Sequence, residues 1–199
     1  MFVQVMTGRT SDPEALQRQL EIWKRDLQPG AIGYQGSTSG CTSDGDVIML
    51  ARFESRDAAM RNSARPEQGQ WWQETEKCFD GPVTFHDTED VEMNDFRGIE
   101  KATFVQVMEG TVNDRRRADQ LEHELDEAVV DGRPDVLGHL TAHFGDRFDE
   151  FVYFSSEAEA RRAESGEMPE EVRARIAEMD EAMTVERYID LKEPWTING

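Results

Sequence analysis

A seven-residue stretch occurs twice in this chain of 199 residues, and it constrains the fold more than any other feature of the sequence. Residues 2–8 read Phe-Val-Gln-Val-Met-Thr-Gly, and residues 104–110 repeat six of these seven positions at an offset of 102. In both copies Phe, Gln and Met alternate with Val, which is the period of a β-strand. A repeat at about half the chain length predicts two domains of the same fold.

The segments that flank the two copies repeat in the same order. Asp12 and Pro13 predict the start of a helix, and large apolar residues then recur at helical spacing from Leu16 to Leu27. Charged helical segments are predicted at 56–79, with breaks near Pro66 and Gly69, and at 156–183, with a break at Pro169; a further helix is predicted at 114–130. We expect strands at 2–7, 32–39, 47–54, 82–91, 103–109, 136–144, 149–155 and 184–191.

Each half therefore has the order β-α-β-β-α-β, which predicts an α+β fold of two tandem ferredoxin-like domains. The helices cover one face of each antiparallel sheet, and the other face also needs a cover. We expect the two sheets to pack face to face within one chain, as a pseudo-dimeric α/β barrel. The first barrel-half domain is expected at 1–92, a linker at 93–102 and the second barrel-half domain at 103–199.

Charge and hydropathy exclude several classes of partner. The chain has 42 acidic and 22 basic residues and a net charge of −20, whereas nucleic acids and anionic membranes bind basic surfaces. No apolar run reaches membrane-spanning length, and the N-terminus lacks the pattern of a signal peptide. Cys41 and Cys78 have neither metal nor redox spacing. We expect a cytoplasmic protein that binds neither nucleic acid nor membrane, with the acidity serving solubility or, alternatively, docking of a basic partner.

Two further motifs resemble a known family. The segment Pro29-Gly-Ala-Ile-Gly-Tyr34, followed by Ala51-Arg-Phe-Glu-Ser-Arg-Asp-Ala-Ala59, resembles the antibiotic-biosynthesis-monooxygenase-like members of the dimeric α/β-barrel superfamily. A weaker version stands in the second half, at 133–138 and 153–160. The resemblance covers nearly the whole chain as a tandem pair. It implies a monomer with an internal pseudo-dimer, or a homodimer of such chains.

The resemblance also implies a function. Family members include cofactor-independent oxygenases of aromatic polyketides, which use Asn, Trp and Arg or Tyr around the substrate, and this chain offers Asn62, Trp71 and Trp72. Haem-degrading members use a histidine on the second helix, and neither 56–79 nor 156–183 contains one. We therefore expect a cofactor-independent monooxygenase of a small aromatic or polyketide-like substrate. The alternative is a non-enzymatic protein of the same fold that binds a small molecule or a partner.

Strand alternation assigns candidate site residues to faces of the sheets. The odd positions of 47–54 are apolar and are expected under the helices, which leaves Arg52 in the barrel interior. In both copies of the repeat we expect Val under the helices and Gln4 or Gln106 in the interior, although a hydrogen-bonded spacer between sheets is the alternative for both glutamines. The expected substrate-binding residues are Gln4, Arg52, Asn62, Trp71, Trp72 and Gln106.

The second half supplies the candidate catalytic residues. His139 and His143 are expected to face inward with Tyr153, in a mostly apolar pocket. Four residues along a strand span roughly 13 Å, which is too far for one metal, so we expect no metal and no cofactor. Either histidine is a candidate general base near neutral pH, and a solvated or interface histidine is the alternative. Of Trp71 and Trp72, one is expected in the core and the other in a pocket or an interface.

Overall fold

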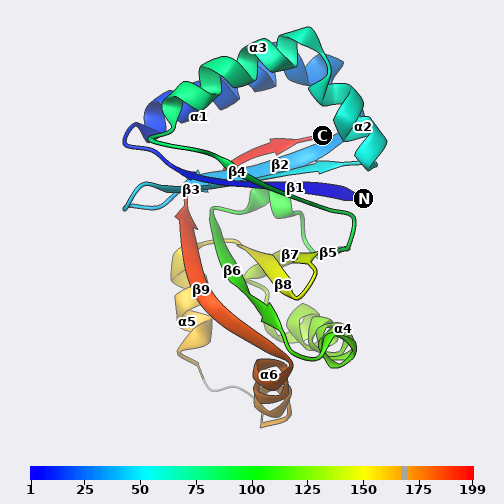
Figure 1. Ribbon diagram of the computed structural model, residues 1–199. Helices are drawn as coiled ribbons and strands as arrows, with labels where there is room; N and C mark the ends of the chain where they lie inside the picture. The colour runs from blue at the N-terminus through cyan, green and yellow to red at the C-terminus, as the bar shows by residue number, and fades with distance from the viewer. Residues whose placement is uncertain (167–169) are drawn as a thin grey trace. The chain divides into compact units, whose positions relative to one another are not determined.

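Two five-stranded sheets, each with helices on one face, make up the structure, which is a computed structural model (Figure 1). It describes the backbone of residues 1–166 and 170–199, and the side chains of these ranges except at positions 127, 128, 131, 164 and 171. Unit 1 comprises Met1–Val91 and Glu193–Gly199, and unit 2 comprises Glu92–Lys192. The two units are described separately.

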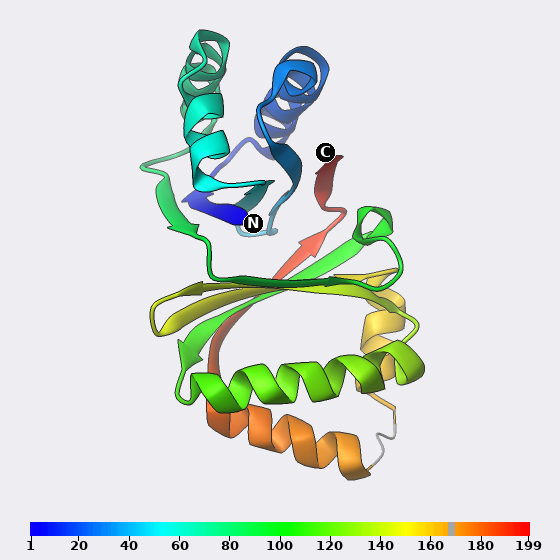
Figure 2. The same ribbon diagram turned by 90° about the vertical axis from the view of Figure 1, so that its right-hand side faces the viewer.

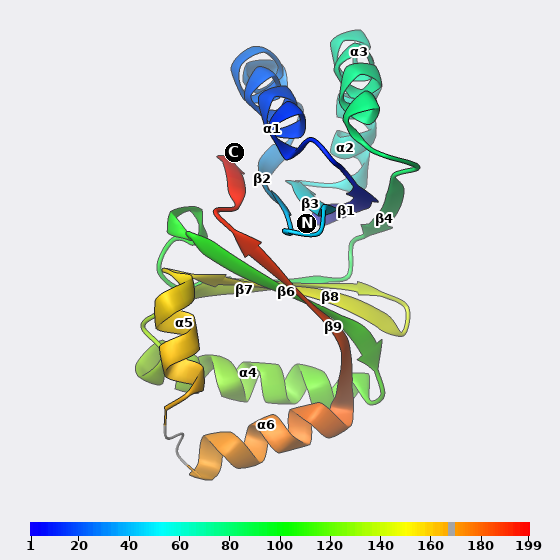
Figure 3. The same ribbon diagram turned by 90° about the vertical axis from the view of Figure 1, so that its left-hand side faces the viewer.

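Unit 1 has the strand order β10-β2-β3-β1-β4. Helices α1 and α3 lie side by side over the same face of this sheet (Figure 3). A π-helical turn at Trp23–Leu27 and a 3-10 turn at Gln28–Gly30 extend α1. The elements are β1 (Phe2–Arg9), α1 (Pro13–Ile22), β2 (Tyr34–Cys41), β3 (Asp46–Phe53), α2 (Arg56–Ser63), α3 (Pro66–Thr75), β4 (Thr84–Thr88) and β10 (Trp195–Asn198).

The core of unit 1 forms where the stripe of α1 meets the sheet. The Asp12 carboxylate accepts a hydrogen bond from the Ala15 amide and caps α1, as its position before Pro13 predicts. Leu16, Leu20 and Trp23 then pack on Met6 of β1 and Met49 of β3. The helix start, the apolar stripe and the alternation of the strands are therefore mutually consistent, and together they place one buried layer between helix and sheet.

Unit 2 has the strand order β5-β7-β8-β6-β9. Helices α4 and α6 run along one face of this sheet, and a 3-10 turn at Ile99–Lys101 precedes β6 (Figure 2). The elements are β5 (Val91–Asp95), β6 (Phe104–Val112), α4 (Arg115–Gly132), β7 (Val136–Phe144), β8 (Arg147–Phe154), α5 (Glu157–Glu164), α6 (Glu170–Ala182) and β9 (Met183–Lys192). No helix in the described part of the chain is both long and apolar enough to span a membrane.

The glycine that closes each repeated stretch has a steric reason. A Cβ atom on Gly110 would lie 2.1 Å from the carbonyl oxygen of Thr184 on the neighbouring strand β9. A Cβ atom on Gly8 would lie 2.7 Å from Cδ1 of Phe79. Both positions therefore admit no side chain without a shift of the neighbour, although the neighbour is backbone in one case and a phenylalanine ring in the other.

The order β-α-β-β-α-β predicted for each half is confirmed. Pro66 separates α2 from α3 as predicted, but Gly69 lies inside α3 and breaks nothing. Residues 91–95 and 195–198 form strands, although a linker and a tail were expected there. The predicted break at Pro169 lies outside the described residues.

The predicted faces of the repeated strands are wrong. Gln4 pairs with Ala51 and Met6 with Met49, so these side chains share the face that the helices cover. Val3 and Val5 consequently lie on the opposite face. The alternation of apolar residues separates two faces but does not say which of them the helices cover, because both faces of β1 carry buried apolar side chains.

The predicted position of Tyr153 beside the histidines is also wrong. Gly145 and Asp146 form a two-residue turn, so Phe144 pairs with Arg147 and His139 pairs with Val152. His139 and His143 therefore share a face of the sheet with Val152, and Tyr153 lies fully buried on the other face.

Candidate functional site

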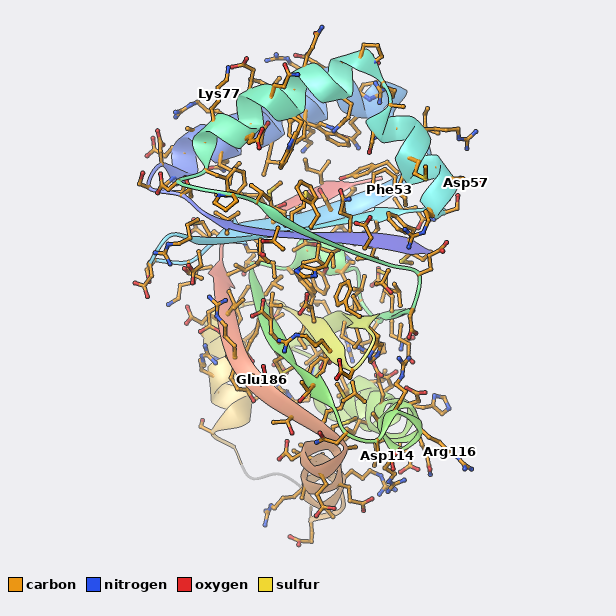
Figure 4. All side chains as sticks on the ribbon, viewed as in Figure 1. Phe53, Asp57, Lys77, Asp114, Arg116 and Glu186 are labelled. Carbon is orange, nitrogen blue, oxygen red and sulfur yellow. The ribbon has the colours of Figure 1, made fainter. Side chains whose placement is uncertain are left out.

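A cavity of about 280 Å³ lies in unit 1 between the sheet and the helices α1, α2 and α3. Its volume is near the lower end of the range for small-molecule sites. Phe53, near the end of the sheet that α2 covers, forms part of its wall (Figure 4). Six aromatic side chains line the cavity: Trp23, Tyr34, Phe53, Trp71, Trp72 and Phe85. An apolar cavity with aromatic walls fits a small planar ligand.

The aromatic walls are held in place by ring contacts and by hydrogen bonds. The ring centroids of Trp23 and Trp71 lie 6.4 Å apart, those of Trp71 and Trp72 lie 6.0 Å apart, and those of Trp72 and Phe85 lie 5.3 Å apart. The indole N–H of Trp71 donates to the carbonyl of Gln19 at 2.8 Å. The indole N–H of Trp23 donates to Gln68 at 2.9 Å. These contacts fix the orientation of the rings before any ligand enters.

Asn62 of α2 presents a hydrogen-bond donor to this cavity. Its side chain lines the cavity and is only 2% exposed. The Oδ1 atom accepts from the Ile32 amide at 3.1 Å and from Nη1 of Arg65 at 2.9 Å. Both partners are donors only, so the amide cannot be turned around. The Nδ2 group has no hydrogen-bond partner among the described residues, and it is the atom available to a ligand oxygen.

Gln4 of β1 reaches the cavity from the sheet. It lines the cavity, and its Nε2 atom donates to the Asp87 carboxylate on β4 at 2.9 Å. The prediction that Gln4 faces a pocket thus agrees with its position, but this pocket lies on the helix side of the sheet. The equivalent residue in unit 2, Gln106, donates to Asp190 at the same distance of 2.9 Å.

Tyr34 is the one titratable side chain among the described residues that line the cavity. Burial raises the pKa of Tyr34 to about 12, although the hydrogen bond to Ser37 lowers it. Its hydroxyl lies 2.8 Å from the Ser37 hydroxyl and 3.1 Å from the carbonyl of Ile197. Tyr34 is therefore a neutral hydroxyl at physiological pH. The described lining of the cavity presents neutral polar groups and no carboxylate, histidine or lysine.

The predicted site residues divide into two groups. Gln4, Asn62, Trp71 and Trp72 lie together around the cavity of unit 1. Arg52 does not join them, because it pairs with Val3 on β1 and so points from the opposite face of the sheet. The predicted residues Gln106, His139, His143 and Tyr153 belong to unit 2.

In unit 2, His139 lies in a buried polar cluster between β7 and α4. The prediction that the histidines face away from the helices is therefore wrong, because this face of β7 is the one that α4 covers. Its Nε2 atom lies 2.9 Å from Oδ1 of Asp126, and its Nδ1 atom lies 3.4 Å from Oε1 of Glu122. Glu150 of β8 lies 3.9 Å from the same Nδ1 atom. Asn94 donates to Asp126 at 2.7 Å. The Glu122 carboxylate also accepts from the Thr141 hydroxyl at 3.0 Å, and His143 lies buried on the same face of β7.

The pKa values of this cluster move together. Burial opposes a charge on His139, but the hydrogen bond to Asp126 and the charges of Glu150, Asp126 and Glu122 outweigh it and raise the pKa of His139 to about 9. Burial, with help from Glu150 and Glu92, raises the pKa of Glu122 to about 8. Burial also raises the pKa of Glu150. His139 is therefore charged at neutral pH, and it lies in a salt-bridged cluster rather than poised as a free base.

Several residues of both sites were absent from the sequence-based expectations. Trp23 lies in the apolar helical run from Leu16 to Leu27, and Tyr34 stands in the motif that resembles the family, but neither is among the predicted site residues. Glu122 and Asp126 lie four residues apart on α4, beside the apolar Leu121 and Leu125 of its buried stripe. A pair of acidic residues at this spacing next to a buried stripe was the signal that could have indicated a polar partner for a histidine.

Within the described ranges, no group of three or more His, Cys, Asp and Glu side chains is arranged to hold a metal ion.

Three solved structures share this fold over almost the whole chain. A provisionally named monooxygenase from Lactobacillus acidophilus covers 99% of this chain and 99% of its own, with a TM-score of 0.71 and 11% identity. A provisionally named monooxygenase from Fusobacterium nucleatum covers 99% and 94%, with a TM-score of 0.76 and 9% identity. A protein described as anthrone oxidase-like covers 99% and 92%, with a TM-score of 0.66 and 11% identity.

The TM-scores show a shared fold, and at these low sequence identities the likeness shows the fold alone. The predicted resemblance to antibiotic-biosynthesis-type monooxygenases is confirmed at this level. No protein-family model matches the chain, and no curated protein matches its sequence.

Proposed function

We propose that the cavity of unit 1 binds a small planar aromatic compound that carries a carbonyl or hydroxyl oxygen, and that the protein oxygenates this compound without a cofactor. The observation that carries the proposal is the Asn62 amide, whose Nδ2 donor is held in an aromatic-walled cavity by partners on its Oδ1 atom. A donor fixed in this way stabilises negative charge on a ligand oxygen without reorganisation.

The proposed chemistry draws its electrons from the substrate. An aromatic ketone with an acidic CH2 group, of the anthrone type, gives a proton to water and becomes an enolate. The enolate transfers an electron to O2 and bonds to the reduced oxygen, and after protonation the resulting hydroperoxide loses water to leave a C=O group. In the net reaction the CH2 group and O2 become C=O and H2O. The described lining of the cavity holds no side-chain base with an ordinary pKa, so the role of Asn62 is to make the substrate more acidic by stabilising its oxyanion. One of the structures with this fold is described as anthrone oxidase-like, which agrees with this substrate class.

The experiment uses anthrone as the probe and has two readouts, the uptake of oxygen and the absorbance of the quinone product. We expect turnover above the uncatalysed rate in the intact protein. Asn62→Asp should reduce it at least roughly tenfold, because the carboxylate removes the donor and repels the oxyanion. Gln73→Glu, the same change from amide to carboxylate at an exposed position of α3 that does not line the cavity, is the matched control and should leave turnover unchanged. Turnover that survives Asn62→Asp would contradict the assigned role of Asn62.

A second candidate function is binding of the same class of compound without a reaction. The neutral lining of the cavity favours it, since a general base is missing among the described lining residues. Saturable binding of anthrone in the absence of oxygen uptake would support this alternative. The catalytic roles predicted for His139, His143 and Tyr153 stay predictions, and the proposed site does not use them.

A further inference from the structure

Three side-chain amides line the cavity of unit 1, and two of them, Asn62 and Gln4, are held in opposite senses. Asn62 is bound through its oxygen and Gln4 through its nitrogen. Both residues line the same cavity. An amide that is free to rotate by half a turn presents either a donor or an acceptor to a ligand, whereas a tethered amide presents only one of them.

The tether of Gln4 is the Asp87 carboxylate. A carboxylate accepts hydrogen bonds and donates none, so it must face the Nε2 group of Gln4. The Oε1 atom of Gln4 then has no hydrogen-bond partner among the described residues and is the acceptor that a ligand meets. Asp87 is exposed on the edge strand β4, so its side chain is not needed for the packing of the core.

Asn62 is held by the Ile32 amide and by Arg65, which is the residue that precedes α3. The Arg65 side chain is 13% exposed, and its Nη1 atom donates to Oδ1 of Asn62 at 2.9 Å. The same guanidinium lies 3.3 to 3.4 Å from the carbonyl of Leu27, and its Nε donates to Glu67 at 2.9 Å. These bonds fix the position of a charged donor behind the Asn62 oxygen, and they keep Nδ2 turned away from it.

We propose that Arg65 and Asp87 are positioning residues that determine the ligand specificity of the cavity, so that it selects a planar ligand with one hydrogen-bond acceptor for Asn62 and one donor for Gln4. The inference rests on the proposed function only in that the cavity takes a small aromatic ligand. It adds that a ligand with both a carbonyl-type oxygen and a separate hydroxyl or N–H group binds more tightly than a ligand with the carbonyl alone.

The pair of Gln and Asp is not by itself a sign of a ligand. Gln106 and Asp190 repeat it in unit 2, where Arg161 also contacts Asp190. What distinguishes the pair in unit 1 is that Gln4 lines a cavity together with a second tethered amide. The substitution of Asp87 therefore tests the proposal better than the geometry of the pair alone.

The test uses four planar bicyclic probes of similar size. 7-Hydroxycoumarin carries a carbonyl and a hydroxyl, coumarin carries the carbonyl only, 7-methoxycoumarin has the hydroxyl blocked, and naphthalene has neither group. Dissociation constants are measured by calorimetry at a pH that keeps the phenol neutral. The variants are Asp87→Lys, which turns Gln4 around because an ammonium group only donates, and Glu89→Lys, an equal charge change on a side chain that does not line the cavity.

We expect intact protein to bind 7-hydroxycoumarin roughly 3- to 10-fold more tightly than coumarin or 7-methoxycoumarin, which is the worth of one neutral hydrogen bond. Asp87→Lys should abolish this preference and leave the affinity for coumarin unchanged, and Glu89→Lys should retain it. Arg65→Met should weaken coumarin binding by a similar factor, and Arg65→Lys should restore part of it.

Three results would overturn the proposal. The first is an unchanged preference for 7-hydroxycoumarin in Asp87→Lys. The second is binding of naphthalene as tightly as the oxygenated probes, and the third is binding of none of the four probes. Circular dichroism of each variant shows whether the fold is retained. Oxygen uptake with anthrone is a separate measurement. A variant-dependent preference without oxygen uptake contradicts the oxygenase and leaves the positioning roles of Arg65 and Asp87 supported.

Discussion

His139 on β7 and Asp126 on α4 lie 2.9 Å apart, from Nε2 to Oδ1, and so join the middle of one sheet to the helix that covers it. Glu122 and Glu150 lie within 4 Å of the other ring nitrogen. The carboxylates of such a cluster favour the charged form of the histidine, and the positive charge of the histidine in turn stabilises the negative charge of the buried carboxylates.

The stability of unit 2 should fall as the pH rises through the neutral range. The pKa of His139 rises in the folded protein from an ordinary value near 6.5 to about 9, and that of Glu122 rises from 4.5 to about 8. Burial raises the pKa of Asp149 to about 7 in the same way. At a pH between the ordinary pKa of each group and its raised pKa, the folded state holds more protons than the unfolded state. The stabilisation is therefore complete below the ordinary pKa values, and it is lost as the pH rises toward about 9.

Urea unfolding at several pH values between about 5 and 9 measures this effect, with a slope of up to about 1.4 kcal/mol per pH unit for each extra proton held. Glu122→Gln is the control, because glutamine keeps an acceptor for Thr141 and cannot titrate. Its stability should depend less steeply on pH than that of the intact protein. Equal slopes for the two proteins would contradict the assignment to Glu122.

His139→Ala should destabilise the fold at neutral pH. The substitution leaves Asp126, Glu122 and Glu150 near one another without their cationic partner, and breaking one side of a buried ion pair costs about 3–5 kcal/mol. Denaturant unfolding measures the loss. His86→Ala, at an exposed position of β4, is the matched control and should cost less than about 0.5 kcal/mol. A stable His139→Ala protein with altered ligand binding would instead support the catalytic role predicted from the sequence.

The two glycines that close the repeated stretch should respond differently to the same change. Gly110→Ala places a Cβ atom against the Thr184 carbonyl of a paired strand, which cannot move without disturbing the sheet. Gly8→Ala meets the Phe79 ring, which can turn aside. We expect Gly110→Ala to lose about 2–3 kcal/mol or more and Gly8→Ala about 1 kcal/mol, as measured by thermal unfolding. A larger loss of stability for Gly8→Ala than for Gly110→Ala would show that the strand pair accommodates a Cβ atom more easily than the Phe79 ring does.

Gly69 offers a test that separates an effect on stability from an effect on binding. It lies inside α3, it lines the cavity, and a Cβ atom there would meet nothing within 4 Å. Gly69→Ala should stabilise the helix by about 1 kcal/mol and change ligand affinity little. Gly69→Phe should also fold, but we expect its side chain to occupy the cavity and to weaken coumarin binding at least roughly tenfold. Unchanged binding by Gly69→Phe would place this side chain outside the ligand site.

Sequence patterns predicted the element order well, because a repeat supplies two independent readings of each element. The repeated strand and the caps at Asp12 and Asp114 agree in both halves. The cavity was harder to place. Met6 and Val5 are both buried, so their alternation cannot show which of them lies under the helices, and only the pairing of Met6 with Met49 decides it.

The misplacement of Tyr153 had a different cause. It followed from counting β7 and β8 separately, whereas the two-residue turn at Gly145 and Asp146 sets their register. Strand β10 was missed because four residues between Pro194 and the last glycine give too short a pattern for alternation to be read. Arg65 and Asp87 carry no signal in the sequence, since their roles depend on which end of a neighbouring amide they reach.

The pairing of β10 with β2 has a consequence for the order in which the protein matures. Unit 1 takes its fifth strand from Glu193–Gly199, after all of unit 2 in the chain. Ile197 of this strand lines the cavity, and its carbonyl lies within hydrogen-bonding distance of the Tyr34 hydroxyl. During synthesis on the ribosome residues 1–91 emerge before unit 2, yet their sheet stays one strand short until residues 193–199 have left the exit tunnel. The ligand site of unit 1 is thus completed only after unit 2 has been synthesised, and a nascent chain that stalls after Lys192 carries an unfinished site.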